Sequence, residues 1–158
     1  MTAKFFMGAI PVLRWISISI LILALAGCSL KKFAVDSLGN ALAEGSSVYA
    51  TDDDPDLVGA ALPFGLKTIE SLLAQSPHHK GLLLAATSGF TQYAHAFVQT
   101  EADLTEDTDL MLAIALRERA LRLYRRGLGY GIRGLEEVQP GFADLLSSDP
   151  VKALAPMC

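Results

Sequence analysis

The sequence contains few cysteines and lacks a strong excess of either charge. Only two cysteines occur among its 158 residues, Cys28 and Cys158, so no disulfide framework is expected. The formal net charge is -4, which argues against a general nucleic-acid binder. Glycine is scattered, so collagen-like and disordered classes do not fit. The length suits one domain with a modest hydrophobic core.

The N-terminus carries an apolar run that is too short for a membrane span. Residues 15–26 ("WISISILILALA") have no charge and follow the basic residues Lys4 and Arg14, which is the layout of a signal peptide. A helix that spans a bilayer needs about 20 apolar residues. The run ends in Leu25-Ala26-Gly27-Cys28, which closely resembles the lipobox read by bacterial lipoprotein signal peptidase. The alternative is an uncleaved N-terminal anchor with an incidental cysteine.

The lipobox predicts a signal peptide over residues 1–27 and a mature helical domain over 28–158. Cys28 would become the first residue, and acyl chains on its sulfur would hold the domain on a membrane. Ser29 follows, at the position where an aspartate would favour retention in the inner membrane. We therefore expect a lipid-anchored protein of the bacterial cell envelope, in the outer membrane and facing the periplasm.

Helical patterns, and no convincing strand, follow the lipobox. Asp54 can cap a helix that begins at Pro55, because proline suits the first helical position. Pro63 lies inside this helix and should kink it. Short loops between long helices imply antiparallel neighbours, so the predicted fold is all-α and built from antiparallel helical hairpins. The expected helices cover residues 30–50, 55–75, 79–99 and 110–135, with a fifth from about 141.

One face of each long helix is predicted to form the core, because its apolar residues recur at steps of three and four. The acidic stretch "TEADLTEDTD", residues 100–109, is expected to connect the third helix to the fourth and to cap the latter. The predicted core faces are Leu62, Leu66, Ile69 and Leu73 in the second helix, Leu83, Ala86, Phe90, Tyr93 and Phe97 in the third, and Leu112, Leu116, Ala120 and Leu123 in the fourth.

Two similar segments hint at an internal repeat. "SLLAQSP" at 71–77 and "DLLSSDP" at 144–150 share Leu-Leu-x-x-x-Pro and lie 73 residues apart. This separation is close to twice the length of a tetratricopeptide unit, which has about 34 residues. The pattern favours a tetratricopeptide-like array, although Leu-Leu pairs before proline are common.

Residues 129–134 spell G-x-G-x-x-G, which would bind a dinucleotide only directly after a buried strand. Here the string follows an arginine-rich helical pattern, so we predict close helix packing or a loosened helix end. Four arginines nearby share one helical face: Arg119, Arg122, Arg126 and Arg133. They form either an anion or partner site, or a solvated face paired with the acidic connector, where exposed pairs stabilise little.

No catalytic or metal centre can be assembled from the remaining polar residues. The aspartates of residues 52–56 lack the glycine and closing glutamate of a calcium loop, so a helix cap is expected. His78 and His79 are adjacent rather than one helical turn apart, and His95 stands alone. No nucleophile–base pair is evident. We predict neither an enzyme nor a bound metal or cofactor.

Three segments carry distinctive joint patterns: "DPDLVGAALPFGLKTIESLLAQSP", "LLLAATSGFTQYAHAFVQTEAD" and "RALRLYRRGLGYGIRGLE". The second contains Ala-Ala-x-x-Gly-Phe-x-x-Tyr-Ala-x-Ala-Phe-Val, and the third contains Leu-Tyr-x-Arg-Gly-x-x-Tyr. Together these segments resemble the T-component (TatT-type) lipoproteins of TRAP transporters. A lipobox precedes the domain in that family as well.

The resemblance implies a tetratricopeptide-like helical array without a catalytic centre. It also implies a periplasmic lipoprotein that forms a homotrimer, engages a TRAP solute-binding subunit and passes a hydrophobic small molecule through a pore or cleft. Family members are considerably longer, so we expect this chain to be incomplete at its C-terminus. The alternative is a structural scaffold lipoprotein in envelope assembly. Our candidates for the ligand or partner surface are Phe64, Phe90, Tyr93, Phe97, Tyr124 and Tyr130.

Overall fold

The computed structural model describes residues 33–44, 49 and 51–155, which contain helices and turns and no strand. The all-α prediction is therefore confirmed for these residues. The predicted signal peptide, Cys28 and Cys158 lie outside the described residues. Residues 33–44 form a helix, followed by α3 (Pro55–Gln75), α4 (Lys80–Tyr93), the π-helical turn η1 (Ala94–Gln99), α5 (Thr100–Thr105), α6 (Leu110–Glu136), α7 (Phe142–Ser148) and α8 (Pro150–Leu154).

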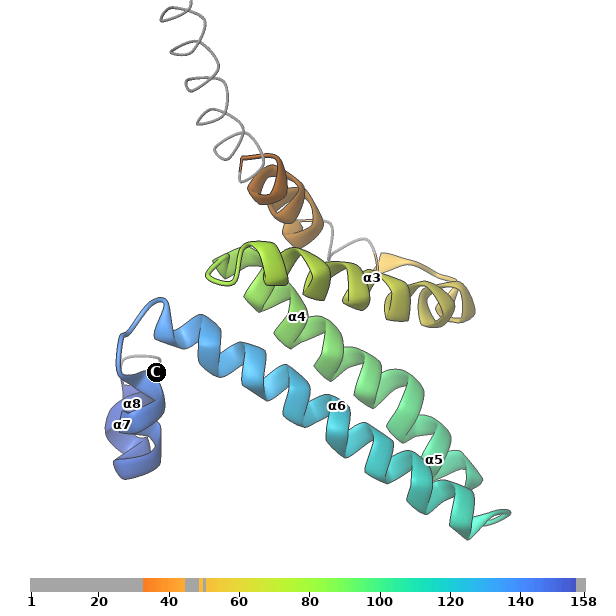
Figure 1. Ribbon diagram of the computed structural model, residues 1–158. Coiled ribbons are helices and arrows are strands. Elements are labelled where there is room, and N and C mark those ends of the chain that lie inside the picture. Colours follow the sequence, from red (N-terminus) through yellow and green to blue (C-terminus); the bar gives the residue numbers. More distant parts are fainter. Residues whose placement is uncertain (1–32, 45–48, 50, 156–158) are drawn as a thin grey trace, which may run out of the picture.

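The helices α4 and α6 lie side by side and run in opposite directions (Figure 1). The helix α3 crosses the first part of α4, and the short helices α7 and α8 stand together beyond the end of α6. The largest buried cluster joins leucines of α3 to α4, with Phe90 at its centre and Tyr130 of α6 packed against it. The pair α4–α6 therefore forms the body of the domain, on which the other elements are placed.

Capping side chains set the start of the long helices. The Asp54 carboxylate accepts the N–H of Leu57 at 3.0 Å, as expected for the helix that begins at Pro55. Asp109 accepts the N–H of Leu112 at 3.0 Å at the start of α6. These bonds satisfy backbone N–H groups that a helix start leaves without partners.

The helix α3 has the predicted bounds and stays helical through Pro63. Its predicted core face is confirmed at Leu62, Leu66 and Leu73, which are buried, while Ile69 is partly buried against the core. By length and composition α3 could also cross a membrane, and 17% of its most apolar window is buried. Its buried leucines pack on α4, as those of a core helix do.

The third helical segment is longer than predicted. It does not end at Gln99, because η1 carries the chain directly into α5, so the first six residues of the expected acidic connector are helical. Ala102 is fully buried where α5 packs on α6, and this contact extends the helix. Within η1, the Thr100 hydroxyl donates to the His95 carbonyl at 3.0 Å, which supports the wider turn.

The buried face of α6 matches the predicted one only in part. Ala120 is buried and Leu123 packs against the core, as predicted, whereas Leu112 is 44% exposed and Ala113 and Gly127 complete the centre of the face. A Cβ added at Gly127 would lie 2.9 Å from the Thr91 hydroxyl, so only glycine fits. Small residues at seven-residue spacing therefore let α4 and α6 approach closely. Two glycines of the G-x-G-x-x-G string, residues 131 and 134, also face α4, so the close-packing interpretation is confirmed.

Candidate binding surface

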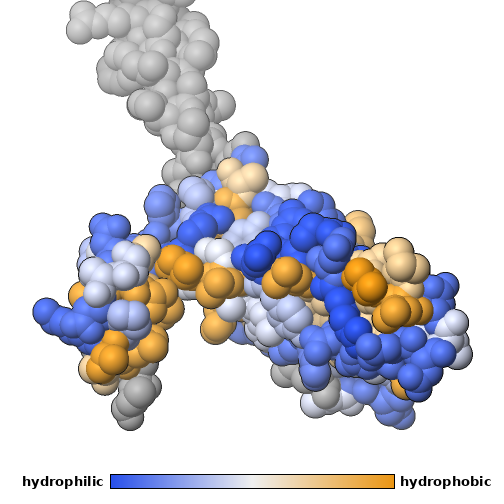
Figure 2. All heavy atoms as spheres, turned by 90° about the horizontal axis from the view of Figure 1, so that it is seen from below, coloured by the Kyte–Doolittle hydropathy of each residue, from blue (hydrophilic) through white to orange (hydrophobic). Residues whose placement is uncertain are grey.

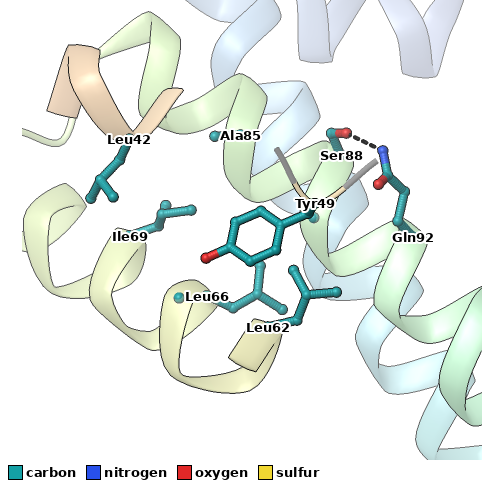
Figure 3. Close-up of a pocket in the computed structure, with 10 residues that line it drawn as sticks. Leu42, Tyr49, Leu62, Leu66, Ile69, Ala85, Ser88 and Gln92 are labelled. Atoms are coloured by element: carbon teal, nitrogen blue, oxygen red, sulfur yellow. Dashed lines mark hydrogen bonds between the residues drawn. The ribbon is translucent and has the colours of Figure 1, made fainter. Parts of the chain in front are cut away.

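An apolar cleft lies between the helix of residues 33–44, α3 and α4 (Figure 3). Leu62, Leu66 and Ile69 of α3 form one wall, and the ring of Tyr49 lies over them. Leu42 closes one end of the cleft. The walls come from the face of α3 that the sequence predicts, whereas Tyr49 gives no sequence signal of its own.

The other wall of the cleft is α4, which approaches α3 through a glycine. A Cβ at Gly89 would lie 2.7 Å from a methyl group of Leu66, so this glycine allows the close approach. Next to it, the Gln92 amide donates to the Ser88 hydroxyl at 2.7 Å (Figure 3). This pair is the polar edge of an otherwise apolar cleft, a combination that suits a greasy ligand with one polar group.

The cleft is nearly filled. Its free space is about 50 Å³, whereas pockets for small-molecule ligands usually measure about 300–1,000 Å³. A second hollow of about 180 Å³ shares Tyr49, Leu62 and Gln92 with it and extends to Phe97. The two hollows are therefore neighbours that share Tyr49, Leu62 and Gln92 in their walls.

The six predicted surface aromatics do not lie on one face. Phe90 is 3% exposed and stacks on Tyr130 with ring centres 5.8 Å apart. The ring centres of Tyr93 and Phe97 are 5.6 Å apart. Phe97 also packs closely on α3 at Gly59, where an added Cβ would lie only 2.7 Å from the Phe97 ring. The remaining two aromatics are separate. Phe64 is 80% exposed on α3, and the Tyr124 hydroxyl donates to Gln99 at 2.6 Å.

A carboxylate links α3 to α6 beside the aromatic pair. The Glu70 side chain is only 10% exposed and accepts the Tyr130 hydroxyl at 2.7 Å, Arg126 Nε at 2.5 Å and Lys67 Nζ at 2.7 Å. Burial opposes its ionised form, but the bonds from Lys67 and Tyr130 and the charge of Arg126 outweigh burial and lower the pKa of Glu70 below 4.5. Burial and the same carboxylate raise the pKa of Tyr130.

The arginines of α6 differ in their partners. Arg117, which the sequence does not single out, binds Glu106 at 2.6 Å and Asp103 at 3.1 Å, and so pairs with the acidic stretch. The four arginines predicted to share a face form no such pair, because within the described residues none of them is paired with residues 100–109. The solvated-pair interpretation is therefore wrong for that face. Arg119 contacts Tyr93 of α4, Arg126 pairs with Glu70 of α3 and Arg133 donates to the Pro77 carbonyl, while Arg122 is exposed.

The predicted loop histidines have structural partners. His79 caps α4, its Nδ1 accepting the N–H of Leu82 at 3.2 Å, and its Nε2 lies 3.2 Å from the Asp36 carbonyl. His78 Nδ1 lies 2.6 Å from the Glu137 carboxylate. Among the described residues, no group of three or more histidine, cysteine or acidic side chains could hold a metal.

Two comparisons place the chain among known proteins. The family described as "TRAP transporter T-component" matches residues 51–158. An "Uncharacterized protein" from Treponema pallidum (strain Nichols) is 39% identical over 139 residues, which covers 78% of this chain and 43% of the relative. The chain thus spans less than half the length of that relative. No solved structure matches the chain.

Proposed function

The chain belongs to the TRAP transporter T-component family, and from this premise we propose that it is a non-enzymatic accessory protein of a TRAP-type transporter in the bacterial cell envelope. The family match carries the proposal, because residues 51–158 include every helix from α3 to α8. The aromatic and leucine-rich surfaces of these helices support a role in binding rather than in chemistry.

We propose a solute-binding subunit of the transporter as the protein partner. The test uses the purified full chain and a purified TRAP solute-binding subunit from the same organism, with association measured by isothermal titration calorimetry. Binding is expected. A matched solute-binding protein from an unrelated transporter class should give no heat of binding. Equal binding of both proteins, or of neither, would count against the proposal.

The hydrophobic ligand is proposed to enter the cleft at Tyr49. Because this side chain lines both hollows, Tyr49→Ala should enlarge the groove and increase binding of a fluorescent fatty acid several-fold. Phe64→Ala is the control, since Phe64 is 80% exposed and lines neither hollow. Equal fluorescence changes in both variants would place the ligand elsewhere.

Lipid attachment at Cys28 would hold the domain on the outer membrane, facing the periplasm. Labelled palmitate should be incorporated into the wild-type protein and not into Cys28→Ala, and the wild-type protein should lose residues 1–27 whereas Cys28→Ala should keep them. A wild-type protein that keeps residues 1–27 and takes up no label would instead support an uncleaved N-terminal anchor.

A stripe on α6 is proposed as the contact between copies in a homotrimer. Ile114, Leu121 and Leu128 recur every seven residues and are 42%, 47% and 59% exposed. The exposed residues Glu118 and Arg125 lie beside the stripe with the same spacing and opposite charge, an arrangement typical of packed helix pairs. Hydrophobic side chains also form separate groups along the lower face of the molecule, with hydrophilic ones between them (Figure 2).

The stripe is tested by oligomeric state. Leu121→Glu should convert the oligomer to monomer in analytical ultracentrifugation, because it places a charge in the contact. Leu104→Glu makes the same change at a leucine that is 80% exposed on α5, outside the stripe, and should leave the oligomer intact. A monomeric wild-type chain would refute the proposed contact.

A further inference from the structure

Three arginines of α6 each lie against an aromatic ring. Arg119 lies 5.8 Å from the centre of Tyr93, Arg126 lies 5.0 Å from Phe90, and Arg133 lies 5.3 Å from Tyr130. They are seven residues apart, which corresponds to about 10 Å along a helix. The result is a straight line of guanidinium groups beside the junction of α4 and α6.

Each of these guanidinium groups is held in place by one further contact. Arg119 donates to the Tyr93 hydroxyl at 3.2 Å, Arg133 donates to the Pro77 carbonyl at 2.9 Å, and Arg126 pairs with Glu70. A guanidinium has five N–H donors, so most donors of each group remain for another partner. Because stacking already limits their motion, little side-chain entropy is left to lose on binding.

The positive charge of this line is poorly compensated. Within the described part of the chain, Glu70 is the carboxylate paired with these arginines, and it also binds Lys67. Arg122, exposed between Arg119 and Arg126, has no ion pair or hydrogen bond with the described residues. A local excess of positive charge thus lies on a chain whose net charge is -4.

We propose that the arginine row, consisting of Arg119, Arg122, Arg126 and Arg133, is a docking surface for an acidic segment of a protein. Carboxylates pair with guanidinium groups through two parallel hydrogen bonds, which suits groups held in fixed positions. Arginine is also enriched among residues that dominate the energy of protein interfaces. This proposal does not rest on which subunit of the transporter binds the chain.

An extended anionic surface fits the row less well. The row is one side chain wide, whereas nucleic acids and anionic bilayers present charge over a broad area. A broad anionic surface would also face the rest of the chain, whose net charge of -4 repels it. A short acidic segment would lie close to the arginines only, and in salt solution charges act over roughly 8–10 Å.

The test measures fluorescence anisotropy of a labelled, alanine-based peptide of about 22 residues whose glutamates recur every seven residues, the spacing of the row. The full chain should bind it, and added salt should weaken binding. Arg119→Glu/Arg122→Glu should weaken binding about tenfold or more. Lys152→Glu is the control, because it makes a like charge change on α8 and should alter affinity less than about twofold.

Arg122→Glu alone keeps the test independent of folding, because this side chain has no contact to lose in the described structure. It should still weaken binding several-fold, with an unchanged circular dichroism spectrum. Absence of binding to the wild-type chain would overturn the proposal. So would equal losses in the Arg122 and Lys152 variants, or binding of phosphatidylglycerol vesicles in preference to the peptide.

Discussion

Replacement of Glu70 by glutamine tests how α3 is held to α6. The side chain is 10% exposed and accepts from Tyr130, Arg126 and Lys67. A hydrogen bond to a charged group contributes about 1.5–3 kcal/mol, but exposed ion pairs contribute only about 0–1 kcal/mol. Lys67 is 66% exposed and Arg126 is 46% exposed, so their shares are discounted. Because glutamine still accepts one bond, we expect Glu70→Gln to lower the free energy of unfolding by about 1–2 kcal/mol.

The assay is urea unfolding followed by circular dichroism, with Glu70→Gln, Tyr130→Phe and the double variant. Since the two side chains bond at 2.7 Å, this double-mutant cycle should show a coupling energy of about 1 kcal/mol.

The pH dependence gives a second reading of the same link. The pKa of Glu70 is lowered in the folded state, so the contribution of Glu70 to stability is full above its ordinary pKa of 4.5 and disappears as pH falls through the lowered value. Because the pKa of Tyr130 is raised above its ordinary value of 10.0, the hydroxyl keeps its proton below pH 10, and the bond is lost only as pH rises through the raised value.

Two results would refute this account of the α3–α6 link. One is additive effects of the two single substitutions at neutral pH. The other is a stability difference between wild type and Glu70→Gln that does not shrink as pH falls below the ordinary glutamate pKa of 4.5.

Other positions give independent predictions. Gly127→Ala should destabilise by about 1–3 kcal/mol, because its Cβ would crowd Thr91, whereas Gly129→Ala meets no atom within 4 Å and should stabilise by about 0.5–1 kcal/mol in thermal unfolding. Asp109→Ala should remove the α6 cap and lower the free energy of unfolding by about 1 kcal/mol. The backbone N–H groups of Ala143 and Gly141 at the start of α7 lower the pKa of Glu136, so the protection factors of these two amides, taken against intrinsic exchange at the same pH, should fall as pH falls through that lowered pKa, and should be smaller at neutral pH in Glu136→Gln than in the wild type.

The bounds of α3 could be predicted because local signals agree there. Asp54 and Pro55 mark the start, and leucines at steps of three and four mark the buried face. The end of the third helix could not be predicted, because the acidic stretch has the composition of a solvated connector. Only the burial of Ala102 against α6, a contact between distant segments, keeps that stretch helical.

Leu112 was wrongly predicted to lie in the buried face of α6, because hydrophobicity and packing distance favour different residues there. Leu112 has the larger apolar side chain, but Ala113 and Gly127 allow α4 to approach. The candidate cleft could be predicted from the sequence only in part, because its leucines follow helical periodicity whereas Tyr49 does not. Glu70 pairs locally with Lys67, but its partner Tyr130 lies 60 positions away, so no local pattern shows that Glu70 links α3 to α6.

The central claim, that this T-component engages a TRAP solute-binding subunit, is tested most directly by hydrogen–deuterium exchange of the full chain with and without that purified subunit. The account predicts slower exchange within α4 or α6 on addition of the subunit, and no change in α8. Identical exchange along the whole chain, at subunit concentrations well above that of the chain, would contradict it.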